Sequence, residues 1–383
     1  MANSPSADAV QAALATVTDP EINRPITEIG MVKSVEIGEG VNAGRVEVGV
    51  YLTTAACPLR GEISTRVTKA VQAVEGVSSV SVVLDVMNDE QRTALRTQLR
   101  GNQPEREIPF ARPESLTRVY GVASGKGGVG KSSVTVNLAV ALAQNGLSVG
   151  LLDADIYGHS VPRMLGLQDR GPTQVETMLM PPQAYGVKVI STGMFTRGNQ
   201  AVTWRGPMLH RALQQFLSDV YWGDLDVLLL DLPPGTGDVA ISLAQLLPAS
   251  ELLLVTTPQL AATEVAERAG TIARQTRQNV VGVVENMAYL PCPHCGEQLD
   301  VFGSGGGALV AERLTEALGH EVPLLGQIPL DVRLREGGDA GRPLVLTEPD
   351  SEAGKALQSI ADRLGSRSRG LAGRSLGLTP TKH

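Results

Sequence analysis

Two different patterns of apolar residues divide the chain. In its first part, apolar and polar residues alternate over 45–52 (RVEVGVYL) and 79–86 (SVSVVLDV). This period is typical of strands with one buried face. Between them, apolar residues over 63–74 recur at helical spacing. We therefore predict a small α+β domain over residues 1–100.

A further helix and a linker follow these strands. Asn88 followed three residues later by Gln91 predicts a capped helix start. The next stretch, GNQPEREIPFARPES, loses its periodicity and contains three prolines, which interrupt regular structure. We predict a linker over residues 101–117.

From about residue 118 the chain alternates nearly continuous apolar runs with helical segments. Such runs are typical of strands covered on both faces. Strands alternating with helices indicate right-handed crossovers, so the fold class is α/β with a doubly wound, mostly parallel sheet. This domain is predicted over 118–365, and a disordered basic tail over 366–383. The apolar runs are RVYGVAS, SVGLLDAD, DVLLLDLPP, ELLLVTT and VVGVVENM.

Composition narrows the classes of function. Aromatic residues make up 3% of the 383 residues and the net charge is −7. Neither value favours binding to nucleic acid or to an anionic membrane. The start has no basic region followed by an apolar run, and no apolar run is long enough to span a bilayer. The sparse, odd set of cysteines, Cys57, Cys292 and Cys295, argues against a disulfide scaffold. We expect a cytoplasmic protein.

The glycine-rich segment ASGKGGVGKSS permits two interpretations. Gly125, Gly127 and Gly130 fit the G-x-G-x-x-G pattern of dinucleotide-binding folds. Asp153 lies near the distance at which those folds place a ribose-binding acid. A nicotinamide or flavin site is therefore one alternative.

The residues that follow favour a nucleoside triphosphate. Lys131 and Ser132 complete G-x-x-x-x-G-K-[ST], in which the lysine neutralises phosphates and the hydroxyl reaches Mg²⁺. Backbone N–H groups of residues 128–131 would complete the cradle at a helix N-terminus. Asp231 ends an apolar strand, as the metal-associated acid of a P-loop NTPase does. We predict a nucleotide phosphate site with Mg²⁺.

Five motifs together resemble one known family. SGKGGVGKSS, DADIYGHSVP, DLPPGTGD, VVENM and CPHC are similar to the Mrp/ApbC iron–sulfur cluster carrier ATPases, of the MinD-like deviant P-loop class. The resemblance covers most of 118–365, and DPEINRPITEIGMV with TTAACP looks like the small domain that often precedes this ATPase in bacteria. It implies slow, Mg²⁺-dependent ATP hydrolysis. It also implies a labile [4Fe–4S] cluster at a homodimer interface, an assembly scaffold and recipient apoproteins.

The resemblance also implies roles for single residues. Lys126 would reach the partner's nucleotide across a dimer, whereas a solvated lysine is the plainer alternative. Asp155 would position or activate the attacking water. Asp153 would contact a ligand of Mg²⁺ and not the ion itself. Either acid would also fit a simple role as the cap of the following turn. Asn286 would contact adenine, or else form a turn. The expected catalytic residues are Lys126, Lys131 and Asp155. The expected nucleotide-binding residues are Gly125, Lys126, Gly127, Gly128, Val129, Gly130, Lys131, Ser132, Ser133, Asp231 and Asn286.

The cysteine pair requires a second chain if it is to hold a cluster. Cys292-Pro-His-Cys295 offers two thiolates, whereas a structural Zn²⁺ or a [4Fe–4S] cluster usually takes four ligands. Two copies in a symmetric dimer would supply four. The expected metal ligands are Cys292 and Cys295, with Ser132 for Mg²⁺. Zinc at the same four thiolates and a redox dithiol are alternatives, and Cys57 fits either a transient ligand or a packed turn residue.

Two other functions compete with the carrier. A MinD/ParA-like positioning switch with a structural zinc shares the glycine loop, but its tail would need an amphipathic face that this chain lacks. An electron donor like the nitrogenase iron protein takes its cluster ligands from two separated loops, unlike this single close pair.

Overall fold

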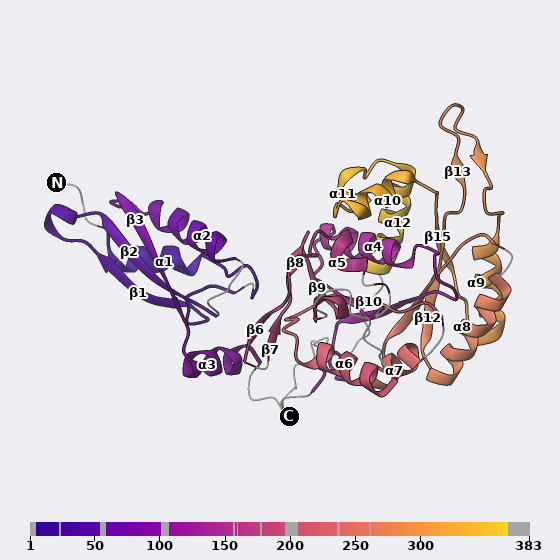
Figure 1. Ribbon diagram of the computed structural model, residues 1–383, viewed down its shortest axis with the longest axis horizontal. Helices are drawn as coiled ribbons and strands as arrows, with labels where there is room; N and C mark the ends of the chain where they lie inside the picture. Colours follow the sequence, from indigo (N-terminus) through magenta and orange to yellow (C-terminus); the bar gives the residue numbers. More distant parts are fainter. Residues whose placement is uncertain are drawn as a thin grey trace, which may run out of the picture. The chain divides into compact units, whose positions relative to one another are not determined.

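The computed structural model describes the chain as two compact units (Figure 1). Unit 1 comprises Met1–Glu105, Pro172–Pro181 and Asp219–Gly223, and unit 2 comprises the rest. The expected tail lies outside the described residues from 367 onward. The described residues are 5–22, 24–53, 59–100, 107–155, 158, 160–176, 178–195, 206–235, 238–259 and 262–366.

Unit 1 is built on a three-stranded sheet in the order β1–β2–β3. β1 runs antiparallel to β2, and β3 runs parallel to it. The two predicted strands and the helix between them are confirmed, as is the cap, where Asn88 and Gln91 exchange hydrogen bonds of 2.8 and 2.9 Å. The elements are α1 (Ala7–Ala15), β1 (Val32–Ile37), η1 (Gly40–Asn42), β2 (Arg45–Leu52), α2 (Arg60–Gln72), β3 (Ser79–Val86) and α3 (Asp89–Arg100).

A hairpin from much later in the chain completes the core of unit 1. Its strands are β6 (Thr173–Val175) and β7 (Met178–Met180). Val175, Met178 and Met180 are fully buried in the same apolar cluster as the core residues of the sheet and of α1 and α2. This packing was not predicted from the pattern of apolar residues.

Unit 2 contains an eight-stranded sheet in the order β15–β12–β11–β4–β10–β5–β9–β8. Every neighbouring pair is parallel except β8 with β9, so the predicted α/β fold class is confirmed. The apolar runs form its central strands, which are buried on both faces. The strands are β4 (Arg118–Ala123), β5 (Val149–Asp153), β8 (Gln183–Ala184), β9 (Val187–Ser191), β10 (Val227–Asp231), β11 (Glu251–Thr256), β12 (Asn279–Asn286) and β15 (Leu324–Ile328).

Helices cover both faces of this sheet (Figure 1). Within the described part of the chain, none combines the length and apolar character that crossing a membrane requires. One face carries α4 (Lys131–Gln144), α5 (Ser160–Met164), α10 (Val332–Asp339), α11 (Leu344–Thr347) and α12 (Glu352–Ser366), and the other carries α6 (Gly206–Ser218), α7 (Asp238–Leu246), α8 (Ala262–Thr276) and α9 (Gly306–Leu318). Short helices η2 (Pro109–Ala111) and η3 (Thr192–Phe195) complete the unit.

The register of the sheet brings the candidate residues together at the carboxyl ends of its strands. Asp231 at the end of β10 pairs with Asp153 at the end of β5 and with Val122 of β4. The glycine loop follows β4 directly, and Asn286 ends β12. Ligands of open parallel sheets bind outside the carboxyl ends of the strands.

Candidate functional site

The glycine loop needs glycine at two backbone positions. Gly128 and Gly130 have φ of +80° and +77°, in the left-handed region that other residues rarely adopt. A Cβ on Gly130 would lie 2.3 Å from Nδ2 of Asn286. Gly130 caps the start of α4, so the loop delivers free backbone N–H groups where anions bind favourably.

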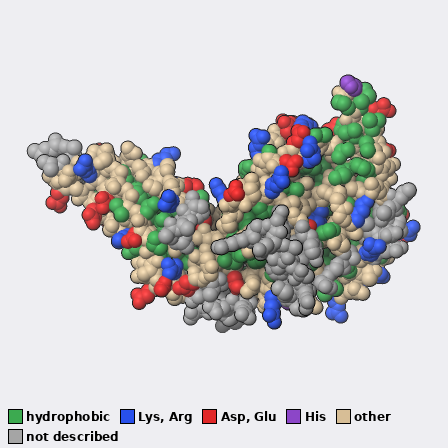
Figure 2. Space-filling view, in the orientation of Figure 1, with side chains coloured by type: hydrophobic (Ala, Val, Ile, Leu, Met, Phe, Trp, Pro, Cys, Tyr) green, Lys and Arg blue, Asp and Glu red, His purple; other side chains and the backbone are tan. Residues whose placement is uncertain are grey.

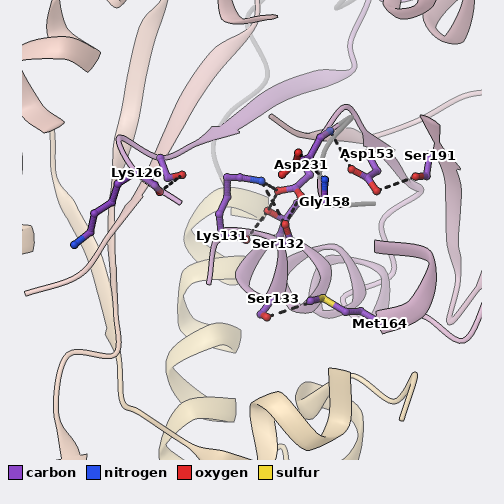
Figure 3. A network of polar contacts seen from close by, with 12 residues as sticks. Lys126, Lys131, Ser132, Ser133, Asp153, Gly158, Met164, Ser191 and Asp231 are labelled. Carbon is purple, nitrogen blue, oxygen red and sulfur yellow. Dashed lines mark hydrogen bonds and ion pairs between the residues drawn. The ribbon is translucent and has the colours of Figure 1, made fainter. Parts of the chain in front are cut away.

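Lys131, Ser132 and Asp231 converge at the start of α4 (Figure 3). The Lys131 ammonium contacts Oδ1 of Asp231 at 2.6 Å, and the Ser132 hydroxyl donates to Oδ2 at 2.5 Å. Asp231 is fully buried and Lys131 is 6% exposed. Thr135, which the sequence did not single out, donates a further hydrogen bond to Oδ1 at 3.0 Å. A hydroxyl beside a carboxylate matches the oxygen donors that Mg²⁺ prefers.

Two more acids lie beside this cluster. The Ser191 hydroxyl donates to Oδ2 of the buried Asp153 at 2.8 Å. Burial, followed by the negative charge of Asp231, raises the pKa of Asp153 to about 8. Asp155 donates its N–H to Asp153 at 3.1 Å and accepts from the Gly158 N–H at 3.1 Å. The cluster thus gathers three carboxyl groups next to the glycine loop.

Lys126 does not join Lys131. It extends away from the Asp231 cluster (Figure 3), and its ammonium donates to Oε1 of Gln259, in the loop after β11. The two lysines of the loop therefore occupy different surroundings within one chain.

Asn286 presents a buried acceptor. Its Nδ2 donates to the carbonyl of Val129 in the glycine loop at 2.9 Å. That bond fixes the orientation of the amide, because a carbonyl accepts only from the nitrogen. Asn286 is 2% exposed, and its Oδ1 has no hydrogen-bond partner among the described residues. A buried acceptor of this kind fits a donor on a bound ligand.

The expected cysteines lie together on a projecting segment, residues 287–304, which we term the finger. It contains the antiparallel pair β13 (Leu290–Pro291) and β14 (Gln298–Leu299). The turn is closed by the Cys292 N–H donating to the carbonyl of Glu297 at 2.8 Å. Apolar side chains gather over it at the upper right of Figure 2; those of Leu299 and Val301 are 44% and 52% exposed.

The two thiols suit a soft metal but do not complete a site. Cys295 is exposed and Cys292 partly exposed. Backbone N–H groups of Cys295 and then His294 lower the pKa of the Cys292 thiol, which favours the thiolate that binds metal. The described residues include no group of three or more His, Cys, Asp or Glu side chains that could hold a metal ion. Cys57 lies outside the described residues.

Comparison with known proteins identifies the family. Residues 115–365 match the family model described as NUBPL iron-transfer P-loop NTPase. Residues 7–82 match the model of an iron–sulfur cluster assembly protein. The chain belongs to the iron-transfer P-loop NTPases. The resemblance noted in the sequence is thereby confirmed.

Individual relatives support this family along nearly the whole chain. An iron–sulfur cluster carrier protein of Mycobacterium tuberculosis is 68% identical over 374 residues, covering 98% of this chain and 97% of the relative. One from Deinococcus radiodurans is 44% identical, covering 93% and 94%. Among solved structures, a nucleotide-binding protein of Archaeoglobus fulgidus in complex with ADP is 36% identical with a TM-score of 0.52, and covers 63% of this chain and 96% of its own.

Proposed function

We propose that the chain is a Mg²⁺-dependent ATP hydrolase and a carrier of a labile [4Fe–4S] cluster, which is bound at the interface of two copies of the chain. One observation carries this proposal. A single compact unit contains both a phosphate-binding loop and a finger that offers two thiols, half the ligands of a cluster. The family and its curated carrier proteins support the same function.

The nucleotide site is best suited to adenine. The free Oδ1 of Asn286 is an acceptor, and adenine carries an amino group where guanine carries a carbonyl. Guanine would therefore leave two acceptors facing each other in a buried place, which is unfavourable. The Archaeoglobus relative, solved with ADP, supports an adenine nucleotide.

The surrounding residues provide the chemistry of phosphoryl transfer to water. Lys131 neutralises phosphate charge once nucleotide replaces its present partner Asp231. Ser132, with Asp231 beside it, would hold Mg²⁺, which would supply charge stabilisation at the phosphates. Asp155 orients the attacking water. Lys126 acts in the partner's site, as its separation from Lys131 supports.

The finger holds the cluster as cargo. Cys292 and Cys295 from each of two copies give four soft, anionic ligands. Because the thiols are accessible, a recipient's own thiolates can replace them. The cluster is loaded from an assembly scaffold and then passes to apoproteins. This takes place in the cytoplasm, a reducing compartment.

Anaerobic reconstitution tests the proposal directly. The full chain, supplied with iron and sulfide, should bind about one [4Fe–4S] cluster per two chains, following the four-ligand count. Iron, sulfide and zinc contents and the absorption spectrum are measured. Cys292→Ala and Cys295→Ala should each abolish the cluster, and the matched control Cys57→Ala should retain most of it. Stoichiometric zinc with no iron uptake would contradict the carrier function and favour a metal-stapled nucleotide switch.

A further inference from the structure

One buried carboxylate ties both ends of the finger to the sheet. Glu285 lies on β12, just before the finger, and is fully buried. Its Oε1 accepts from the N–H of Gly307 at 2.6 Å, in the first turn of α9, where the finger returns. Its Oε2 accepts from the side-chain amide of Gln327 on β15 at 2.5 Å. The two oxygens together join the entry, the exit and the neighbouring strand.

The exit of the finger is packed without room for side chains. A Cβ on Gly307 would lie 2.6 Å from Cβ of Glu285. A Cβ on Gly306 would lie 2.7 Å from the carbonyl oxygen of Pro258, in the loop after β11. The neighbour of Gly306 is backbone, which cannot give way as a flexible side chain can. The start of α9 is therefore packed closely against both β12 and this loop.

Both of these contacts lead to the glycine loop. Asn286, next to Glu285, points to the opposite face of the strand and bonds the carbonyl of Val129. Gln259, next to Pro258, accepts from Lys126. The phosphate-binding loop thus touches the two segments that seat the finger.

We propose that Glu285 is a positioning residue that transmits the state of the nucleotide loop to the cysteine finger. Nucleotide in the loop moves Val129 and with it the end of β12. The two bonds of Glu285 carry that movement to Gly307 and α9. Withdrawal of Lys126 from Gln259 frees the second contact. The geometry of Cys292 and Cys295 consequently follows nucleotide occupancy. The identity of the cargo on the finger rests on the proposed function, whereas the coupling does not.

Thiol accessibility in the metal-free full-length protein tests the coupling. The alkylation rates of Cys292 and Cys295 by iodoacetamide are measured by mass spectrometry with and without Mg²⁺-ATP. In the unmodified chain nucleotide should change these rates by about fivefold or more, the lower range of typical coupling between sites. Glu285→Ala should remove most of this response. Glu285→Gln should keep most of it, because its amide accepts from Gly307 and donates to a turned Gln327.

The controls separate positioning from folding and from nucleotide binding. Glu316→Ala removes an exposed carboxylate of α9, paired with Arg313, and should respond fully. Gln327→Met breaks only the bond to Oε2 and should weaken the response. It serves as the test where Glu285→Ala does not fold. Binding of a fluorescent ATP analogue is measured separately, which distinguishes loss of nucleotide binding from loss of coupling. Loss of binding would count against the proposed function. Bound nucleotide without any change in alkylation, or an unaltered response in Glu285→Ala, would overturn the coupling.

Discussion

At the scale of single residues, unit 1 contains an acidic side chain whose pKa differs between the folded and the unfolded chain. Glu21 is 8% exposed, and the Thr173 hydroxyl of the hairpin donates to its Oε1 at 3.2 Å. Burial, and then the negative charge of Asp19, raise the pKa of Glu21 to about 7 from a usual 4.5. The folded state therefore binds this proton more tightly than the unfolded chain. Its contribution to stability is present at low pH and is lost as pH rises from about 4.5 to about 7.

Replacing this acid should remove the part of the pH dependence that Glu21 causes. Glu21→Gln should stabilise unit 1 at pH 8 by on the order of 2 kcal/mol and should have a much smaller effect at pH 5. The measurement is urea unfolding at both pH values, monitored through the hydrogen exchange of unit 1 amides. Glu28→Gln, at an exposed position, should change neither. An equal shift at both pH values would mean that the charge of Glu21 is not responsible.

At the scale of elements, the β6–β7 hairpin belongs to the core of unit 1. Met178 is fully buried there, and the Leu179 N–H donates to the carbonyl of Asp219 at 2.8 Å while the Tyr221 N–H donates to that of Leu179 at 2.8 Å. Thr93 of α3 also donates to the carboxylate of Glu176. Segments distant in the sequence thus complete one apolar core.

Truncating a hairpin side chain should consequently destabilise the N-terminal sheet. Met178→Ala should cost about 2–5 kcal/mol of unit 1 stability, the usual range for such a buried side chain. Hydrogen exchange should accelerate in β1, β2 and β3 and remain unchanged in the strands of unit 2. Gln174→Ala, at an exposed position of the same hairpin, is the control. Unchanged protection of β2 in Met178→Ala would show that the hairpin is not part of this core.

The sequence predicted those parts of the fold whose causes are local. Strand 118–123, its glycine loop and the Asn88–Gln91 cap each follow from residues close together in the chain. The strands that end in Asp153 and Asp231 were also expected, and the parallel register places these acids side by side. Roles for these site residues remain predictions.

What the sequence missed depends on distant partners. β6 and β7 are three residues each, too short for a period to be recognised, and their burial comes from another part of the chain. Ser191, Gln259 and Glu285 are ordinary polar residues in the sequence. They gain importance only because sheet order brings Asp153, Lys126 and Gly307 to them.

At the scale of the whole molecule, the proposed function requires two copies acting together. If Lys126 serves the partner's nucleotide, neither Lys126→Ala nor Asp155→Ala should hydrolyse ATP well as a homodimer. Mixing them creates one site with an intact Asp155 whose partner supplies Lys126. Steady-state hydrolysis of the mixture should exceed that of either variant alone.

The composition of the mixture provides the control. Activity should rise and fall with the fraction of mixed dimers as the ratio of the variants is varied. Mixing Lys126→Ala with Lys126→Ala/Asp155→Ala, which offers no lysine, should restore nothing. Activity equal to the sum of the separate homodimers would contradict a role across the dimer.

The hairpin in unit 1 also constrains how the protein is made. The ribosome releases the strands of unit 1 first, but Met178, Met180 and Tyr221, which pack against them, are synthesised much later. At 5–20 residues per second, Tyr221 follows Leu95 by roughly 6–25 seconds. Throughout that interval the nascent N-terminal sheet exposes the apolar surface that the hairpin later covers. We therefore expect the core of unit 1 to be completed only after more than half of the chain has been translated.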